Sequence, residues 1–239
     1  MQKPEKPLGR KTYGSIPHLP SSRLGPGDHK CSEGQAKIAT QETKKSRNQR
    51  VICQEKMDGS SCGVCKKDGE IISLVRAGYP AYTSPFKQHH LFADWVYKNQ
   101  SRFLNLLEEG ERVIGEWLVQ AHGTRYSLPH EPFVVFDVIK DDKRAIFDEF
   151  KERVEACDFV MPCLISDGLP ISVDKVMNTL LPYGYHGALE KIEGAVWRVE
   201  SKKRGQYQVD FLAKYVRPNK VDGHYLNFSG PVWNDYVCT

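Results

Sequence analysis

The stretch VICQEKMDGSSCGV (51–64) decides how this sequence is interpreted. An apolar run typical of a β-strand ends at Glu55-Lys56, and Asp58-Gly59 separates it from a second run of the same kind. Asp-Gly is a favoured two-residue turn and lysine commonly flanks it, so an ordinary hairpin would explain the pattern. The alternative is that Lys56 stands at the end of its strand as a nucleophile.

Alternating patterns predict a protein with mostly antiparallel strands around this stretch. The runs VICQEK, SSCGVCKK and EIISLVRA predict three antiparallel strands, with Lys67-Asp68-Gly69 as the hairpin turn between the last two. Further strands are predicted at 112–122, 132–140, 194–200 and 207–217.

Three segments have the spacing of amphipathic helices. The first covers 85–109 and stops at Gly110, and the second covers about 143–157. The third is short, with Ser172 as its N-cap, and ends before Leu181-Pro182. Strands outnumber helices and group as hairpins, so the predicted class is α+β.

Composition predicts one globular domain. The chain has 239 residues, of which 40% are hydrophobic and 27% charged, and no apolar run approaches the roughly 18 residues that span a bilayer. No secretory signal is visible, so we expect a cytoplasmic protein. The seven cysteines are scattered, which suits reduced thiols. Cys62 and Cys65 have zinc-like spacing but lack a second ligand pair.

The basic charge is concentrated at the N-terminus. Residues 1–50 hold eleven lysines and arginines against four acidic residues, while the whole chain has a net charge of +4. We expect 1–49 to be an irregular basic leader and 50–239 to be the folded domain. On charge alone, a phosphate-bearing partner and a solvated flexible arm are equally good explanations of the leader.

Lys56-Met57-Asp58-Gly59 is a K-x-D-G sequence, which alone is a weak signal. Its context strengthens it, because further polar or aromatic residues follow in a fixed order, each on or beside a predicted strand. They are Arg76, Glu116, Phe136, Glu193 in EGAV, and Lys214.

In this order of motifs the chain resembles the covalent nucleotidyltransferase superfamily, which includes ATP-dependent DNA and RNA ligases and mRNA capping enzymes. Within it, the resemblance is closest to the RNA ligase family, because GEWLVQAHGTRYSLPHEPFVVFDV is similar to the segment of its small members that contains GEW and FxxFD. The residues that resemble motifs I, Ia, III, IIIa, IV and V are, in order, Lys56 to Gly59, Arg76, Gly115-Glu116, Phe136-Asp137, Glu193 to Val196, and Lys214.

The resemblance implies a nucleotidyltransferase domain of mostly antiparallel sheets flanked by helices, without an OB-fold domain, acting as a monomer. It implies that Lys56 takes AMP from ATP, passes it to the 5′-phosphate of RNA, and that a 3′-hydroxyl then displaces AMP. Mg²⁺ or Mn²⁺ would be held by Glu116 and Glu193. The nucleotide-binding residues would be Glu55, Asp58, Gly59, Arg76, Glu116, Phe136, Glu193 and Lys214.

A nucleophilic lysine must lose its proton, although the ordinary pKa of a lysine is about 10.4. We expect a bound metal and Lys214 to disfavour the ammonium form of Lys56. Phe136 lies in the apolar run VVFDV, so packing in the core and stacking on adenine are both open.

The sequence departs from the family pattern in motif V, which usually has two basic residues. Here Leu212 and Val216 flank Lys214 on the same strand face, so Arg217 or Lys220 is a candidate for the second role. Alternative functions are DNA nick sealing, GTP-dependent capping, or nucleic-acid binding without catalysis. We also hypothesise that HLPSSRLGPGDHKC (18–31) folds over the nucleotide site or guides the strand end.

Overall fold

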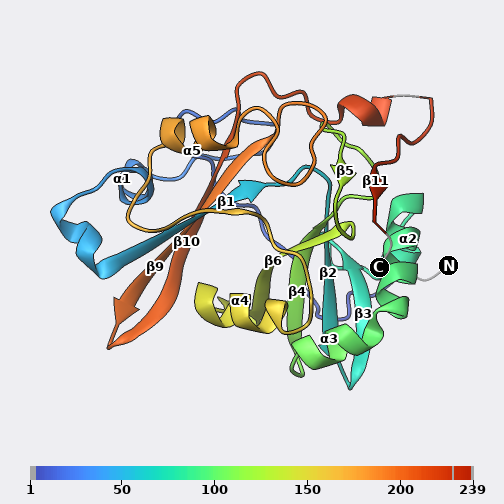
Figure 1. The fold of residues 1–239 in the computed structure, drawn as a ribbon. Coiled ribbons are helices and arrows are strands. Elements are labelled where there is room, and N and C mark those ends of the chain that lie inside the picture. Colours follow the sequence, from blue (N-terminus) through green and yellow to red (C-terminus); the bar gives the residue numbers. More distant parts are fainter. Residues whose placement is uncertain (1–3, 228, 238–239) are drawn as a thin grey trace.

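The computed structural model describes residues 4–227 and 229–237 and contains two large antiparallel sheets (Figure 1). One sheet has the order β10-β9-β1-β8 and consists of β1 (Gln49–Lys56), β8 (Leu164–Gly168), β9 (Gly194–Lys203) and β10 (Gln206–Val216). The other has the order β3-β2-β4-β6-β7 and consists of β2 (Ser60–Lys67), β3 (Glu70–Val75), β4 (Glu111–Trp117), β6 (Phe133–Lys140) and β7 (Lys143–Arg144). The predicted α+β class with antiparallel sheets is confirmed.

A short third sheet pairs β5 (Ser127–Leu128) with β11 (Asp235–Tyr236) in parallel. Within the described residues every strand belongs to one of these three sheets, and we see no separate OB-fold domain.

Helices pack against both large sheets, and α4 lies between them (Figure 1). α1 (Glu33–Thr40) and α5 (Val173–Leu180) share a core with β1, β9 and β10. α2 (Lys87–Lys98), α3 (Gln100–Leu106) and α4 (Phe147–Glu155) share another with β2, β4 and β6. Short 3₁₀ turns lie at η1 (Lys44–Asn48), η2 (Ala81–Thr83) and η3 (His224–Asn227). Among the described helices, none combines the length and the apolar character that crossing a bilayer demands.

The first three strands are formed as predicted, but they do not lie in one sheet. β1 pairs with β8 and β9, whereas β2 pairs with β3 and β4. Asp58-Gly59 is therefore not a hairpin turn but the crossing between the two sheets. Gly59 fits this crossing because a Cβ there would lie 2.6 Å from the carbonyl oxygen of Trp117. The hairpin at Asp68-Gly69 is confirmed, and both residues have positive φ, as a tight hairpin turn requires.

Helix boundaries differ from the predictions where side chains or strand edges intervene. The segment 85–109 forms two helices, and the Asn99 side chain donates to the carbonyl of Trp95 at the break. The segment 143–157 begins as strand β7 before α4 starts. The third helix is confirmed, with the Ser172 hydroxyl accepting from the Lys175 N–H. β8 was not predicted, because LISDG is mostly solvent-facing and has no clear apolar alternation.

The leader is folded against the domain over much of its length. Helix α1 begins with a capping box between Ser32 and Gln35. Upstream of it, the chain runs beside the edge strand β10, where the Leu19 N–H donates to the Lys214 carbonyl at 2.8 Å. Tyr13 and Leu19 are buried.

The leader also packs directly against the backbone of Gly63 in β2, where there is no side chain. A Cβ there would collide with the Thr12 methyl group and lie 2.8 Å from the Val113 carbonyl oxygen.

We predict that Gly63→Ala lowers the free energy of unfolding by about 1–3 kcal/mol, because overpacking forces backbone shifts. Urea denaturation measures this. Gly34→Ala is the control, since its nearest atom is 3.9 Å away in helix α1; equal destabilisation of both variants would contradict the packing argument.

Candidate active site

Lys56 lies at the end of β1, where the chain leaves one large sheet for the other. A cavity of about 980 Å³ opens here, lined by residues of both sheets and of the leader. It collects every site residue predicted from the sequence: Glu55, Lys56, Asp58, Gly59, Arg76, Glu116, Phe136, Glu193 and Lys214.

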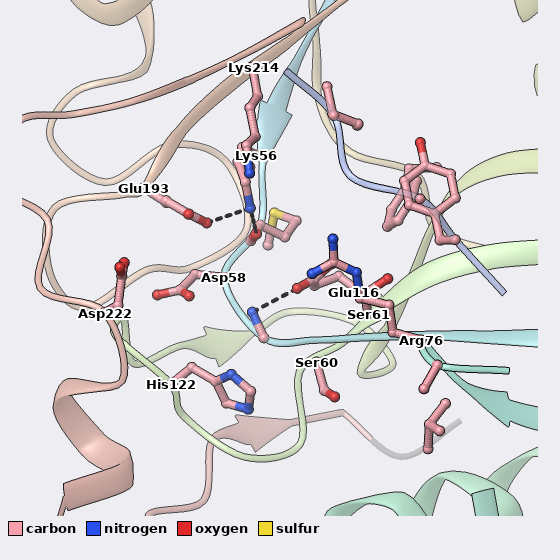
Figure 2. A pocket seen from close by; sticks show the side chains of 18 of the residues that line it. Lys56, Asp58, Ser60, Ser61, Arg76, Glu116, His122, Glu193, Lys214 and Asp222 are labelled. Carbon is pink, nitrogen blue, oxygen red and sulfur yellow. Dashed lines mark hydrogen bonds and ion pairs between the residues drawn. The ribbon is translucent and has the colours of Figure 1, made fainter. Parts of the chain in front are cut away.

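The strand pairing fixes the partner of Lys56. Lys56 is opposite Gly194 in the β1–β9 register, so Glu193 stands just before the neighbouring strand begins. Lys56 Nζ lies 2.7 Å from Glu193 Oε2 and also donates to the Met57 carbonyl at 3.2 Å (Figure 2). Glu193 is 8% exposed, which makes this a partly desolvated ion pair.

The charge state of Lys56 differs from the expected one. Burial lowers its pKa, but the attraction of Glu193 and Glu116 outweighs burial, so the pKa lies above the ordinary value. The ammonium is therefore the resting form of Lys56. We expected cations to dominate its surroundings, but in the structure carboxylates are closest to it.

Glu116 supports the crossing between the sheets. Its Oε1 accepts from the Gly59 N–H at 3.1 Å (Figure 2), and Ser61 is its register partner on β2. Burial raises the pKa of Glu116 to about 7, although the charge of Lys56 opposes the shift. A carboxyl with this pKa can change its proton occupancy near neutrality.

Asp58 is held by loops from distant parts of the chain. The Gly123 N–H donates to its Oδ2 at 3.0 Å, and the Asp58 N–H donates to the Tyr126 hydroxyl at 3.2 Å. Lys220 forms an ion pair with the same Oδ2 and donates to Thr124 at 3.2 Å. This lysine is buried behind Asp58 and does not line the cavity.

Phe136 and Arg76 form part of the wall formed by the five-stranded sheet. Phe136 is partly exposed to the cavity and packs edge-on against Tyr13 of the leader at 5.3 Å between ring centroids. Asp137 points to the other side of β6, where it pairs with Arg144 and Arg198. Arg76 is exposed, and its guanidinium donates to Ser15 Oγ of the leader at 3.3 Å.

Lys214 is the basic residue that β10 contributes to the cavity. Burial lowers its pKa, and the charge of Lys56 adds to that effect. Of the two candidates for a second basic residue, Lys220 neutralises Asp58, whereas Arg217 donates to the carbonyls of Ile192 and Lys191.

Glu55 points away from Lys56 because neighbouring strand residues alternate. Its Oε2 accepts from the Tyr185 N–H at 2.9 Å, whereas Oε1 is buried without a hydrogen-bond partner among the described residues. Burial raises the pKa of Glu55 to about 7. Oε1 lies against Gly184, and Glu55 is among the residues that line the cavity.

Sequence reasoning missed several residues of the site. Tyr13 and Asp28 come from the leader, which had no periodic pattern, and Tyr126 comes from a loop. Lys220 was named only as a candidate second basic residue, and its ion pair with Asp58 was not foreseen. The GPGD turn around Asp28 was the only local signal, because turn residues fix the place of an adjacent side chain.

The acidic side chains fit a divalent cation that also binds phosphate. Among the described residues, no group of three His, Cys, Asp or Glu forms a ready metal cage. Mg²⁺, however, is usually held by one or two carboxylates with phosphate and water completing its shell. Asp58 is paired with Lys220, so Glu193 and Glu116, the two carboxylates that act on Lys56, are the oxygen donors available to such an ion.

The family described as "RNA ligase" matches residues 49–216, so the chain belongs to the RNA ligase family. A search of curated proteins by sequence found no match.

Solved structures show the same fold. The RNA ligase of Naegleria gruberi with PPi matches with a TM-score of 0.54 at 18% identity, covering 72% of this chain and 50% of that chain. A mutant of the same ligase with ATP and Mn gives 0.51 at 14% identity, covering 84% and 58%. The chain thus spans about half the length of the first of these proteins.

We predict that Lys220→Met lowers the free energy of unfolding by about 3 kcal/mol, because it leaves the largely buried Asp58 carboxylate without its cation. Urea denaturation measures the loss. The double variant Asp58→Asn/Lys220→Met should lose less, and the exposed Lys151→Met on α4 should change little. Additive losses in the double variant would show that the pair is not coupled.

Proposed function

We propose that this protein is an ATP-dependent RNA ligase that forms a lysyl-AMP intermediate on Lys56. The observation that carries the proposal is the position of the Lys56 amine. It lies on the wall of a cavity that also presents the carboxylate of Glu193 and the cations of Lys214 and Arg76. A purely structural lysine has no need of further cations in the same cavity.

The first step would be attack of the Lys56 amine on the α-phosphorus of ATP. A bond forms between the lysine nitrogen and the α-phosphorus. The bond between the α-phosphorus and the oxygen that bridges it to the β-phosphorus breaks, and pyrophosphate leaves. Before this the ion pair with Glu193 must loosen and the ammonium must lose a proton. The Lys56 side chain is 21% exposed, so water can take that proton.

The cavity offers a place for each part of the nucleotide. The exposed part of Phe136, backed by Tyr13, provides an aromatic surface for the base. Glu55 also lines the cavity, and its carboxyl would accept a hydrogen bond from an amino group. Lys214 and Arg76 would bind phosphate oxygens, Lys214 as a point charge and Arg76 through its planar fork.

Glu116 and Glu193 would hold Mg²⁺ or Mn²⁺. When bound, the ion supplies positive charge that weakens the hold of the carboxylates on the Lys56 proton and stabilises the departing pyrophosphate. Gly59 and Asp58 keep the crossing between the sheets in place, so that Lys56 and Glu116 face the same space.

The second and third steps would transfer AMP to an RNA 5′-phosphate and then release it. A 5′-phosphate oxygen displaces Lys56 from the adenylate phosphorus, and a 3′-hydroxyl next attacks the activated 5′-phosphorus and expels AMP. The RNA ends as substrates, a cytoplasmic setting and action as a monomer belong to this proposal.

We predict that the wild-type protein becomes labelled by α-labelled ATP with Mg²⁺ but not by γ-labelled ATP, and that Lys56→Ala abolishes labelling. Denaturing electrophoresis measures the covalent label. Lys66→Ala is the matched control, since Lys66 is a half-buried lysine of β2 that donates to the Leu107 carbonyl. Unlabelled wild-type protein that still binds RNA would instead favour a binding module without catalysis.

The same assay distinguishes the other nucleotidyltransferase functions. Labelling by GTP in place of ATP would indicate capping chemistry. Sealing of nicked DNA in preference to 5′-phosphorylated RNA would indicate a DNA ligase. We expect ATP and RNA ends to be preferred in both comparisons.

A further inference from the structure

The leader makes a chain of polar contacts that begins and ends on β10. The Val216 N–H donates to Ser22 Oγ at 2.8 Å, and Ser22 Oγ lies 2.6 Å from His18 Nδ1. His18 Nε2 lies 3.0 Å from Asp28 Oδ2, and Asp28 Oδ1 accepts from Lys214 Nζ at 3.5 Å. We call His18, Ser22 and Asp28 the leader bracket.

The bracket is a packed part of the protein. His18 is 1% exposed and Ser22 7%. Backbone hydrogen bonds join the leader to β10 at the same point. The Lys214 N–H donates to the Pro17 carbonyl at 2.9 Å, and the Leu19 N–H donates to the Lys214 carbonyl at 2.8 Å. Both the backbone and the ammonium of Lys214 are therefore fixed by the leader.

Asp28 is an unusual wall residue for a cavity that binds phosphates, since a carboxylate repels them. It is nevertheless anchored there, because its Oδ2 accepts from the Gly25 N–H at 3.0 Å. The same oxygen lies 3.0 Å from His18 Nε2, in a geometry that does not form a hydrogen bond. Among the described residues, Asp28 is the one carboxylate that forms an ion pair with Lys214. We therefore attribute the position of Asp28 to its ion pair with Lys214.

The identity of residue 216 gives a reason for this arrangement. Val216 lies two residues beyond Lys214 on the same strand face, and its apolar side chain leaves Lys214 without a second basic neighbour there. A free lysine side chain loses about 2 kcal/mol of rotamer entropy when it is ordered. Ordering it before the nucleotide arrives removes part of that cost from the reaction.

We propose that Asp28, anchored by the Gly25 N–H and packed against His18, is a positioning residue that orients the Lys214 ammonium toward the nucleotide phosphates, which makes the leader a part of the ATP site. The proposal rests on the proposed function, because it assigns a task to Lys214 in that reaction. Asp28 also lies outside the segment that matches the RNA ligase family, which begins at residue 49.

The first test is the rate of lysyl-AMP formation as a function of ATP concentration. Asp28→Asn should lower the maximal rate about tenfold, as loss of a supporting residue does in other sites, and change the half-saturating ATP concentration less. Asp28→Glu should recover part of the rate. Arg10→Ala is the control, since it removes only the ion pair of the leader with exposed Asp142 and should react like the wild type.

The second test needs no enzymatic activity. Limited acetylation of the nucleotide-free protein, followed by peptide mass spectrometry, reports how accessible the Lys214 amine is. Asp28→Asn should raise acetylation of Lys214 several-fold, while Arg10→Ala should not. An unchanged Lys214 reactivity would overturn the inference, and so would an Asp28→Asn protein that forms lysyl-AMP as fast as the wild type or faster.

The two tests separate the inference from the proposed function. Wild-type protein that never forms lysyl-AMP would refute the proposed function, while the acetylation pattern would still decide whether Asp28 holds Lys214. Normal labelling of the wild type with no effect of Asp28→Asn would refute the inference alone.

Discussion

The ion pair between Lys56 and Glu193 depends on the way the two large sheets are joined. β1 delivers Lys56 at its last residue, β9 begins just after Glu193, and their register sets the side chains 2.7 Å apart. The chain then crosses to the other sheet through Asp58-Gly59, which brings Glu116 to the same place. One crossing thus gathers the charges of the site.

Charge balance explains why so many ionisable groups share this cavity. Carboxylates raise the pKa of Lys56, and burial raises the pKa values of Glu116 and Glu193. The protonation states of Lys56, Glu116 and Glu193 therefore depend on one another's charges and on burial. A bound nucleotide and metal would change these charges and shift protons among the three side chains. Because the pKa of Lys56 is raised, the proton stays on its amine in the structure, and the proposed reaction requires that this proton be removed.

Much of the site could be predicted from the sequence because its residues lie at strand ends in a fixed order. Lys56, Glu116 and Glu193 were selected by their motifs, and the structure brings all three to one cavity. The change of sheet between β1 and β2 could not be predicted, because an Asp-Gly pair has the same local appearance in a hairpin and in a crossing between sheets. The segment 18–31 was expected near the site from its charge and position, but the individual contacts of Tyr13 and Asp28 could not be predicted, since irregular segments are positioned by tertiary contacts that leave no periodic signal.

The most direct measurement of the central claim is to locate the nucleotide on the protein. Protein incubated with ATP and Mg²⁺ in the absence of RNA is digested under mildly alkaline conditions, and the modified peptide is sequenced by mass spectrometry. The account predicts AMP on Lys56, joined through nitrogen and removed by excess pyrophosphate. AMP on Lys214 or another lysine, or an unmodified protein that nevertheless seals RNA, would contradict it.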